Sequence, residues 1–174
     1  MFKKFKSVAL TSVLFVFGFA YNASATPINT SANIVGNITV TETTPLSFGD
    51  ITSGTTAGTV TLTTGGAISA SNATIVLLGS EQVGDMALNT TGVPVASTIT
   101  VTVTGGTLTS GLNTMTVLGN CEGPGGAASA INAPCTFTVT PGPAESVLIG
   151  GELSVGANQA TGNYTGTMEV TAAF

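Results

Sequence analysis

Threonine and branched apolar residues alternate along much of this chain. In residues 97–104, Ile99, Val101 and Val103 occupy every second position and serine or threonine fills the positions between them. The same alternation recurs in three further segments, residues 59–63, 114–117 and 136–140. A period of two is typical of strands with one buried and one exposed face, and β-branched threonine suits the exposed face. The pattern therefore predicts a protein built from half-buried strands.

Clusters of glycine and proline separate these segments, and no segment carries an amphipathic helical stripe. The clusters predict turns, and they are Gly65-Gly66, Gly105-Gly106, Pro124-Gly125-Gly126, Pro141-Gly142-Pro143 and Gly150-Gly151. The segments between them predict strands at residues 34–42, 46–51, 58–63, 67–78, 82–88, 97–104, 112–119, 135–140, 146–155 and 163–173. Many short strands in a chain of this length favour an all-β fold, an antiparallel β-sandwich. A closed β-barrel is the alternative.

The first 25 residues have the pattern of a secretory signal peptide. Three lysines precede an apolar run from Val8 to Ala20, and Ala23-Ser24-Ala25 provides small residues for cleavage. The run is shorter than the roughly 20 residues that span a bilayer. We therefore expect cleavage before Thr26 and no membrane insertion of the mature chain. Residues 26–174 are expected to form a single β-sandwich domain, with residues 26–33 as a candidate N-terminal extension.

The charged residues limit the range of possible functions. Lys3, Lys4 and Lys6 are the only basic residues, and the chain has no histidine. The eight acidic residues all follow residue 25. A mature chain without cations cannot bind nucleic-acid phosphates or clamp a transferring phosphoryl group. It also lacks the imidazole base of Ser-His and Cys-His nucleophiles and any attraction to an anionic membrane. We expect a secreted, acidic protein that is no enzyme and has no cofactor, metal or nucleic-acid partner.

The two cysteines, Cys121 and Cys135, follow a secretory segment, so we expect them to form a disulfide. The enclosed loop is rich in glycine, alanine and proline, and closing a loop of about 15 residues contributes about 3 kcal/mol in the chain-entropy model. We interpret the bond as a clip on a flexible hairpin loop. A redox or metal role is the alternative, although the spacing is not Cys-x-x-Cys.

The acidic residues form no recognisable site. Glu81 and Asp85 are four positions apart, the others are scattered, and no calcium-binding loop of the Asp-x-Asn-x-Asp-Gly type occurs. A pair of carboxylates for glycoside hydrolysis could come from distant strands, but residues 26–174 offer few aromatic platforms for a sugar. Solvated charges that keep the protein soluble are the favoured interpretation.

The C-terminal segment shows a regular alternation that ends on an aromatic residue. One face of this strand carries Tyr164, Gly166, Met168, Val170, Ala172 and Phe174. A final strand of this kind, with a glycine about a dozen residues before its end, resembles the C-terminal signature of bacterial chaperone–usher pilins. The resemblance implies that this strand pairs with a periplasmic chaperone.

The N-terminal segment after the signal peptide alternates in the same way. One face carries Ile28, Thr30, Ala32, Ile34, Gly36, Ile38 and Val40. It resembles a pilin donor strand, and the following motif Pro45-Leu46-Ser47-Phe48-Gly49-Asp50-Ile51 is similar to the Leu-x-Phe-Gly segment of archaic pilins and spore-coat-U-like proteins. Over residues 32–174 the chain resembles a family of small secreted bacterial proteins that is catalogued as a pilin-like domain of unknown function.

The resemblance implies an immunoglobulin-like, pilin-like sandwich and a structural role. We expect a subunit of a fimbria or pilus-like surface fibre, in which an extended segment of one copy completes the sheet of the next. Like subunits, a periplasmic chaperone and an usher would be its partners. The expected location is the periplasm in transit, then the cell surface or medium. The alternative is a self-contained sandwich that binds a ligand or glycan as a monomer, with ordinary first and last strands.

Overall fold

The computed structural model describes residues 38–93 and 95–174, and these residues form strands and no helix. The strands are β1 (Thr39–Thr44), β2 (Asp50–Thr52), β3 (Gly58–Leu62), β4 (Ile68–Ala70), β5 (Val76–Gly79), β6 (Gly84–Asn89), β7 (Ser97–Thr104), β8 (Gly106–Ser110), β9 (Asn113–Glu122), β10 (Cys135–Val139), β11 (Glu145–Val155) and β12 (Glu169–Ala173). Every ladder between them is antiparallel. In this described part, no helix is long and apolar enough to cross a membrane.

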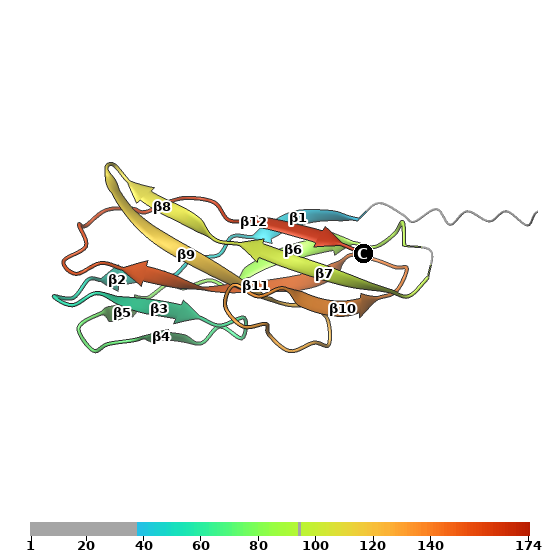
Figure 1. Cartoon of the computed structure of the whole chain (residues 1–174), viewed down its shortest axis with the longest axis horizontal. Coiled ribbons are helices and arrows are strands. Elements are labelled where there is room, and N and C mark those ends of the chain that lie inside the picture. The colour runs from blue at the N-terminus through green and yellow to red at the C-terminus, as the bar shows by residue number, and fades with distance from the viewer. Residues whose placement is uncertain (1–37, 94) are drawn as a thin grey trace, which may run out of the picture. The chain divides into compact units, whose positions relative to one another are not determined.

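The strand β11 is the centre of a seven-stranded sheet (Figure 1). Leu148 and Ile149 pair with both β6 and β9, so these two strands lie on opposite edges of β11. Gly151 and Leu153 pair with both β3 and β9, which places β3 on the same edge as β6, further along the strand. β1 extends the sheet beyond β6, β4 beyond β3, and β8 beyond β9.

A three-stranded sheet, in the order β10-β7-β12, forms the second layer. Phe137 of β10 lies opposite Ile99 of β7, and Val170 of β12 lies opposite Val103. The short strands β2 and β5 pair with each other as a third, two-stranded sheet. The structure is therefore an antiparallel β-sandwich, as the sequence predicts.

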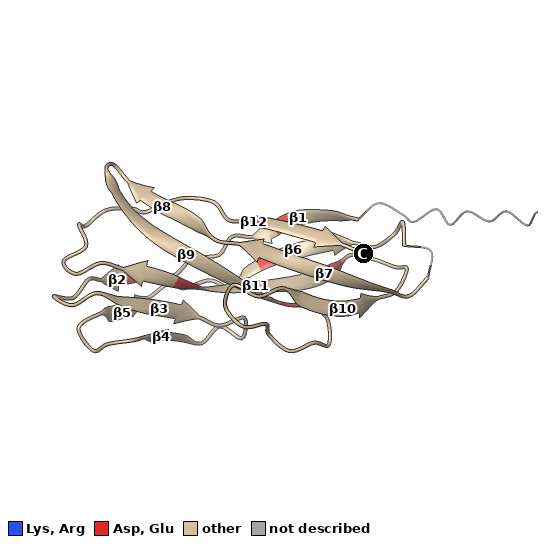
Figure 2. Cartoon of the chain, viewed as in Figure 1, with Lys and Arg blue, Asp and Glu red and all other residues tan. Residues whose placement is uncertain are grey.

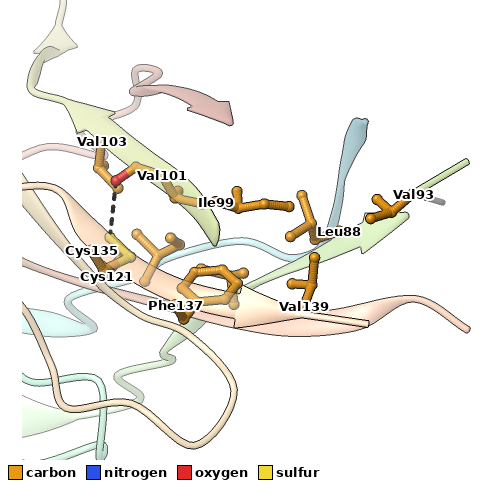
Figure 3. Close-up of a cluster of buried hydrophobic side chains, with 11 residues drawn as sticks. Leu88, Val93, Ile99, Val101, Val103, Cys121, Cys135, Phe137 and Val139 are labelled. Atoms are coloured by element: carbon orange, nitrogen blue, oxygen red, sulfur yellow. Dashed lines mark hydrogen bonds between the residues drawn. A yellow bond between two sulfur atoms is a disulfide. The ribbon is translucent and has the colours of Figure 1, made fainter. Parts of the chain in front are cut away.

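Two clusters of buried side chains form the core. The first lies between the two larger sheets and is shown in Figure 3; its buried members are Leu88, Val93, Ile99, Val101, Val103, Cys121, Cys135, Phe137, Val139, Val147 and Ile149. The second lies over the other half of the large sheet and comprises Phe48, Val60, Leu62, Ile75, Val117, Leu153 and Val155. On β7 and β10 the buried residues occupy alternate positions, so the alternation in the sequence corresponds to an inner face.

The disulfide Cys121–Cys135 is present and joins the two larger sheets, with a Cα–Cα distance of 5.7 Å. Cys121 belongs to β9 and Cys135 to β10. The enclosed loop is held against β9, because the Ser129 amide donates to Cys121 O at 2.8 Å and the Asn132 amide donates to Gly119 O at 2.7 Å. The prediction of a disulfide is confirmed, but the bond connects two layers rather than closing a free hairpin loop.

The expected strand positions agree best for the central strands. β7 has the expected bounds, and β3, β10 and β11 agree to within one residue at each end. The segment 67–78 is wrong as a single strand, because a turn at residues 71–74 divides it into β4 and β5. The expected strand 163–173 is too long, because β12 begins only at Glu169. The sequence pattern does not predict β8.

Candidate functional site: an open groove beside the C-terminal strand

Among the edge strands of the described sandwich, β1 and β12 lie beside each other. β1 forms a ladder with β6 only, and β12 forms a ladder with β7 only. The two strands belong to different sheets and approach each other without pairing. A sandwich that is open along such a line has unpaired backbone amides and carbonyls on both sides, which can pair with an added strand.

A groove with a volume of about 930 Å³ continues along the same side of the molecule. Residues 44–53 form one wall and residues 159–168 form the opposite wall. The remaining lining comes mostly from the large sheet and is largely apolar, with Met86, Leu108, Met115, Val117, Ile149, Leu153 and Val155. Because the lining includes members of both core clusters, the groove opens directly onto the hydrophobic core.

Incomplete burial marks the strands beside this groove. On β7 the inward residues Ile99, Val101 and Val103 are at most 3% exposed. On β1 and β12, and at the residue directly before each, the inward side chains are only partly buried, although they pack against the same core; they are Ile38, Val40, Met168, Val170 and Ala172. The two sheets therefore leave the core only partly covered between β1 and β12. An added apolar strand along this line would bury more of these side chains.

Close backbone approach holds the C-terminal wall against β8. Thr109 and Thr165 exchange two hydrogen bonds, 2.8 Å from the Thr109 amide and 3.1 Å from the Thr165 amide. A Cβ on Gly166 would overlap the carbonyl oxygen of Thr107, and one on Gly106 would overlap that of Thr167. Glycine at both positions lets the two chains lie this close. After residue 168 the chain passes from the seven-stranded sheet to the three-stranded sheet, which it joins as β12.

Hydrogen bonds of Tyr164 stabilise the turn at the start of the wall formed by residues 159–168. Its hydroxyl donates to Ala160 O at 2.8 Å and accepts from Gln159 Nε2, also at 2.8 Å. The Ser53 hydroxyl donates to Gln159 O at 3.0 Å, so the two walls are joined at one end of the groove. The polar contacts of Tyr164 fix the wall, and its ring contributes to the lining.

The structure brings most of the predicted C-terminal residues to one place. Tyr164, Gly166, Met168 and Val170 all line the groove. Phe174 ends the chain and is 50% exposed. Alternation alone indicates this strand; that its residues form one wall of an open groove depends on which strand edges stay unpaired.

The predicted donor segment is described only at its end. Ile28, Ala32, Ile34 and Gly36 lie outside the described residues, as does the proposed signal peptide at residues 1–25. Ile38 and Val40 pack against the core of their own chain, and Val40 pairs with Leu88 of β6. These two residues belong to the domain in cis, so any segment that acts in trans ends before Ile38.

Several groove residues could not be selected from the sequence. Leu108 and Met115 come from the β8–β9 hairpin, and Glu42 and Asp50 are the only charged residues that line the described groove. Leu108 alternates with threonine, which marks it as inward-facing, but the sequence gives no sign that its strand flanks an opening. Figure 2 shows acidic residues on several strands and no basic residue on the described chain.

The residues considered for other chemistry do not converge. Asp85 accepts a hydrogen bond from the Ser146 hydroxyl at 2.6 Å, and neither Glu81 nor Asp85 lines the groove. Within the described ranges, no three His, Cys, Asp or Glu side chains gather in a way that could hold a metal. The groove combines an apolar floor with walls that carry many hydroxyl and amide side chains, such as Ser47, Thr52 and Asn163.

Comparison with known families places the chain in one of them. The model for a domain of unknown function, DUF4402, matches residues 38–174. The match covers every strand of the described structure, from β1 to β12. The chain therefore belongs to the DUF4402 family, as the resemblance to a secreted domain of unknown function led us to expect. No curated protein matches the chain.

Proposed function

We propose that the protein is a structural subunit of a fimbria or pilus-like surface fibre, with an immunoglobulin-like, pilin-like sandwich. In this proposal the subunits join by β-strand addition, in which an extended segment of one copy fills the groove of the next. The observation that carries the proposal is the open line between β1 and β12, where unpaired edges border a groove with an apolar floor and the core is only partly covered.

The proposed occupant is the segment before Ile38 in a second copy. Its residues 28, 32 and 34 are apolar and alternate with polar ones, so one face of the strand would enter the groove. Residues 26–37 contain no charged side chain, which suits a groove whose only charged lining residues in the described chain are Glu42 and Asp50. Ten residues of extended strand cover about 33 Å.

The proposal also includes the route to the surface. Residues 1–25 would act as a signal peptide, and a periplasmic chaperone would cover the groove until an usher passes the subunit to the growing fibre. The strand β12, with its unpaired edge, is the proposed partner of the chaperone. The fibre would then be located at the cell surface or in the medium.

A self-contained domain that binds a small ligand is the second candidate. The groove volume lies within the range of about 300–1,000 Å³ that is usual for ligand pockets. In that case the protein would be a stable monomer, and the N-terminal segment would have no effect on its association state.

Truncation of the N-terminal segment separates the two candidates. A secreted chain that lacks residues 26–33 should form no polymers in size-exclusion chromatography or negative-stain microscopy, whereas the full mature chain should form them. The substitution Ile34→Asp should have the same effect, because an unpaired carboxylate in an apolar groove is costly. Val35→Asp, on the opposite face, is the matched control and should polymerise. A full mature chain that folds reversibly as a monomer without a chaperone would refute the fibre.

Substitutions in the groove, instead of in the N-terminal segment, provide a second test. Leu108 is partly buried and lines the groove, while the adjacent Thr107 is exposed on the opposite face of β8. Leu108→Asp should prevent a synthetic peptide of residues 26–37 from binding to the truncated chain, and Thr107→Asp should leave binding within about threefold. Equal binding by both variants, measured by calorimetry, would place the peptide outside the groove.

A further inference from the structure

A second polar site lies on the outer face of the large sheet, around Gly150. Asn120 of β9 is paired with Gly150 of β11, and its side chain extends over the glycine. A Cβ on Gly150 would lie 2.7 Å from Asn120 Oδ1, 2.6 Å from the carbonyl oxygen of Leu62 and 3.0 Å from the amide of Thr64. The absence of a side chain at position 150 therefore leaves room for the Asn120 side-chain amide next to the backbone of Leu62 and Thr64.

Asn120 carries an unsatisfied oxygen at this point. The residue is 6% exposed, and its Nδ2 donates to Ser129 O at 3.0 Å. Its Oδ1 is fully buried and has no hydrogen-bond partner among the described residues. A buried acceptor without a partner destabilises the folded state, so such atoms in native proteins commonly have an ordered water or an ion beside them.

The same face of β9 also carries a carboxylate without a cationic partner. Glu122 is two positions after Asn120 on β9, so both side chains emerge on the same face. The hydroxyl of Thr64, which is 4% exposed, donates to Glu122 Oε2 at 2.5 Å. The chain has no basic residue after Lys6, so no side chain of the folded domain can neutralise this partly buried carboxylate.

We propose that Asn120, Glu122 and Thr64 bind a divalent cation, with Ca²⁺ as the favoured ion. A side-chain amide oxygen, a carboxylate, a hydroxyl and the nearby carbonyl of Leu62 are the hard oxygen ligands that Ca²⁺ takes, and waters complete its coordination. The ligands come from two strands that are separated by β11, so the ion would tie the end of β3 to β9. The sequence carries no calcium-loop motif, because the ligands are brought together only by strand pairing.

Calcium dependence of thermal unfolding tests this proposal. The mature protein, purified after secretion and treated with a chelator, should show a higher Tm with CaCl2 at 10 mM, and calorimetry should give a Kd of about 10⁻⁴–10⁻³ M, as in extracellular calcium modules. Glu122→Gln should weaken binding at least about tenfold. Glu152→Gln is the matched control, because Glu152 also accepts from a threonine, Thr61, across strands, at 3.4 Å, without an orphaned amide beside it.

Other outcomes overturn the proposal. An ordered water at Asn120 would give no calcium-dependent shift, and nonspecific screening of acidic charge would give equal shifts in the Glu122→Gln and Glu152→Gln variants. Asn120→Asp provides a second readout if Glu122→Gln does not fold. It should lower stability without calcium and tighten calcium binding about tenfold, and unchanged affinity would contradict the site. The result is independent of fibre formation, since the site lies outside the groove lining.

Discussion

At the scale of single residues, Gly119 shows how closely the two layers pack. It lies on β9 with its missing side chain directed at β7, where a Cβ would overlap the Cγ1 methyl of Val103. Val103 is fully buried and has a stiff, branched side chain, so it has little room to move aside. Contact between the layers here depends on the absence of a side chain.

Gly119→Ala should therefore destabilise the domain. Overpacking a well-packed core costs about 1–3 kcal/mol, and urea unfolding of the mature protein measures the loss. Gly142→Ala is the control, because the nearest atom to its Cβ would be 3.9 Å away and its φ is not in the left-handed region. That variant should be neutral or slightly stabilising, since alanine reduces the entropy of the unfolded chain. Equal stability of the two variants would show that β7 and β9 are less tightly packed than described.

At the scale of elements, pairing differs sharply between the centre and the open side. β11 has partners on both edges, so its amides form ladder bonds in both directions. β1 and β12 each have one partner, and about every second amide of these strands faces the unpaired edge. Local opening should be easiest along this line.

Hydrogen exchange of the monomeric protein should reflect this difference. We expect the slowest amides in β11 and β9, and rapid exchange at alternate amides of β1 and β12, measured by NMR or mass spectrometry. Polymerisation by strand addition should slow exchange in β1 and in residues 159–173 and leave β4 unchanged. Protection of β4 instead would mean that copies associate through a different edge.

Local alternation predicts the central strands because one face of each strand packs in the core and the other is exposed, so residue type follows burial directly. It misses β8, because Gly105 and Gly106 predict a turn: a Cβ on Gly105 would lie 2.5 Å from Val117 O, so glycine there allows two strands to approach closely. It also extends the last strand too far, because residues 163–168 alternate equally well beside β8 in the other sheet. The groove could not be predicted, since open edges depend on strand pairing across the whole chain.

At the scale of the whole molecule, the charge is entirely negative after the proposed cleavage. Eight acidic side chains have no basic side chain to balance them, and they are spread over several strands (Figure 2). Three of them are exposed and five are partly buried. Mutual repulsion at neutral pH keeps copies apart except where specific contacts form.

Acidification should therefore cause association rather than charge-driven unfolding. Free carboxyl groups titrate near pH 4, and a chain without basic side chains approaches zero net charge below that pH. We expect light scattering from the truncated, non-polymerising chain to rise below about pH 4 while circular dichroism stays β-like. Scattering that remains flat down to about pH 3 would contradict this expectation.

The position of Tyr164 has a practical consequence. The chain contains no tryptophan and two tyrosines, and the other one, Tyr21, falls within the proposed signal peptide. In the mature protein a single phenol would then account for all tyrosine fluorescence, and it stands in the wall of the groove with its hydroxyl bonded to Ala160 O. A strand or ligand that enters the groove would change the surroundings of this ring, so we expect tyrosine emission to follow occupancy of the groove without a label or a substitution.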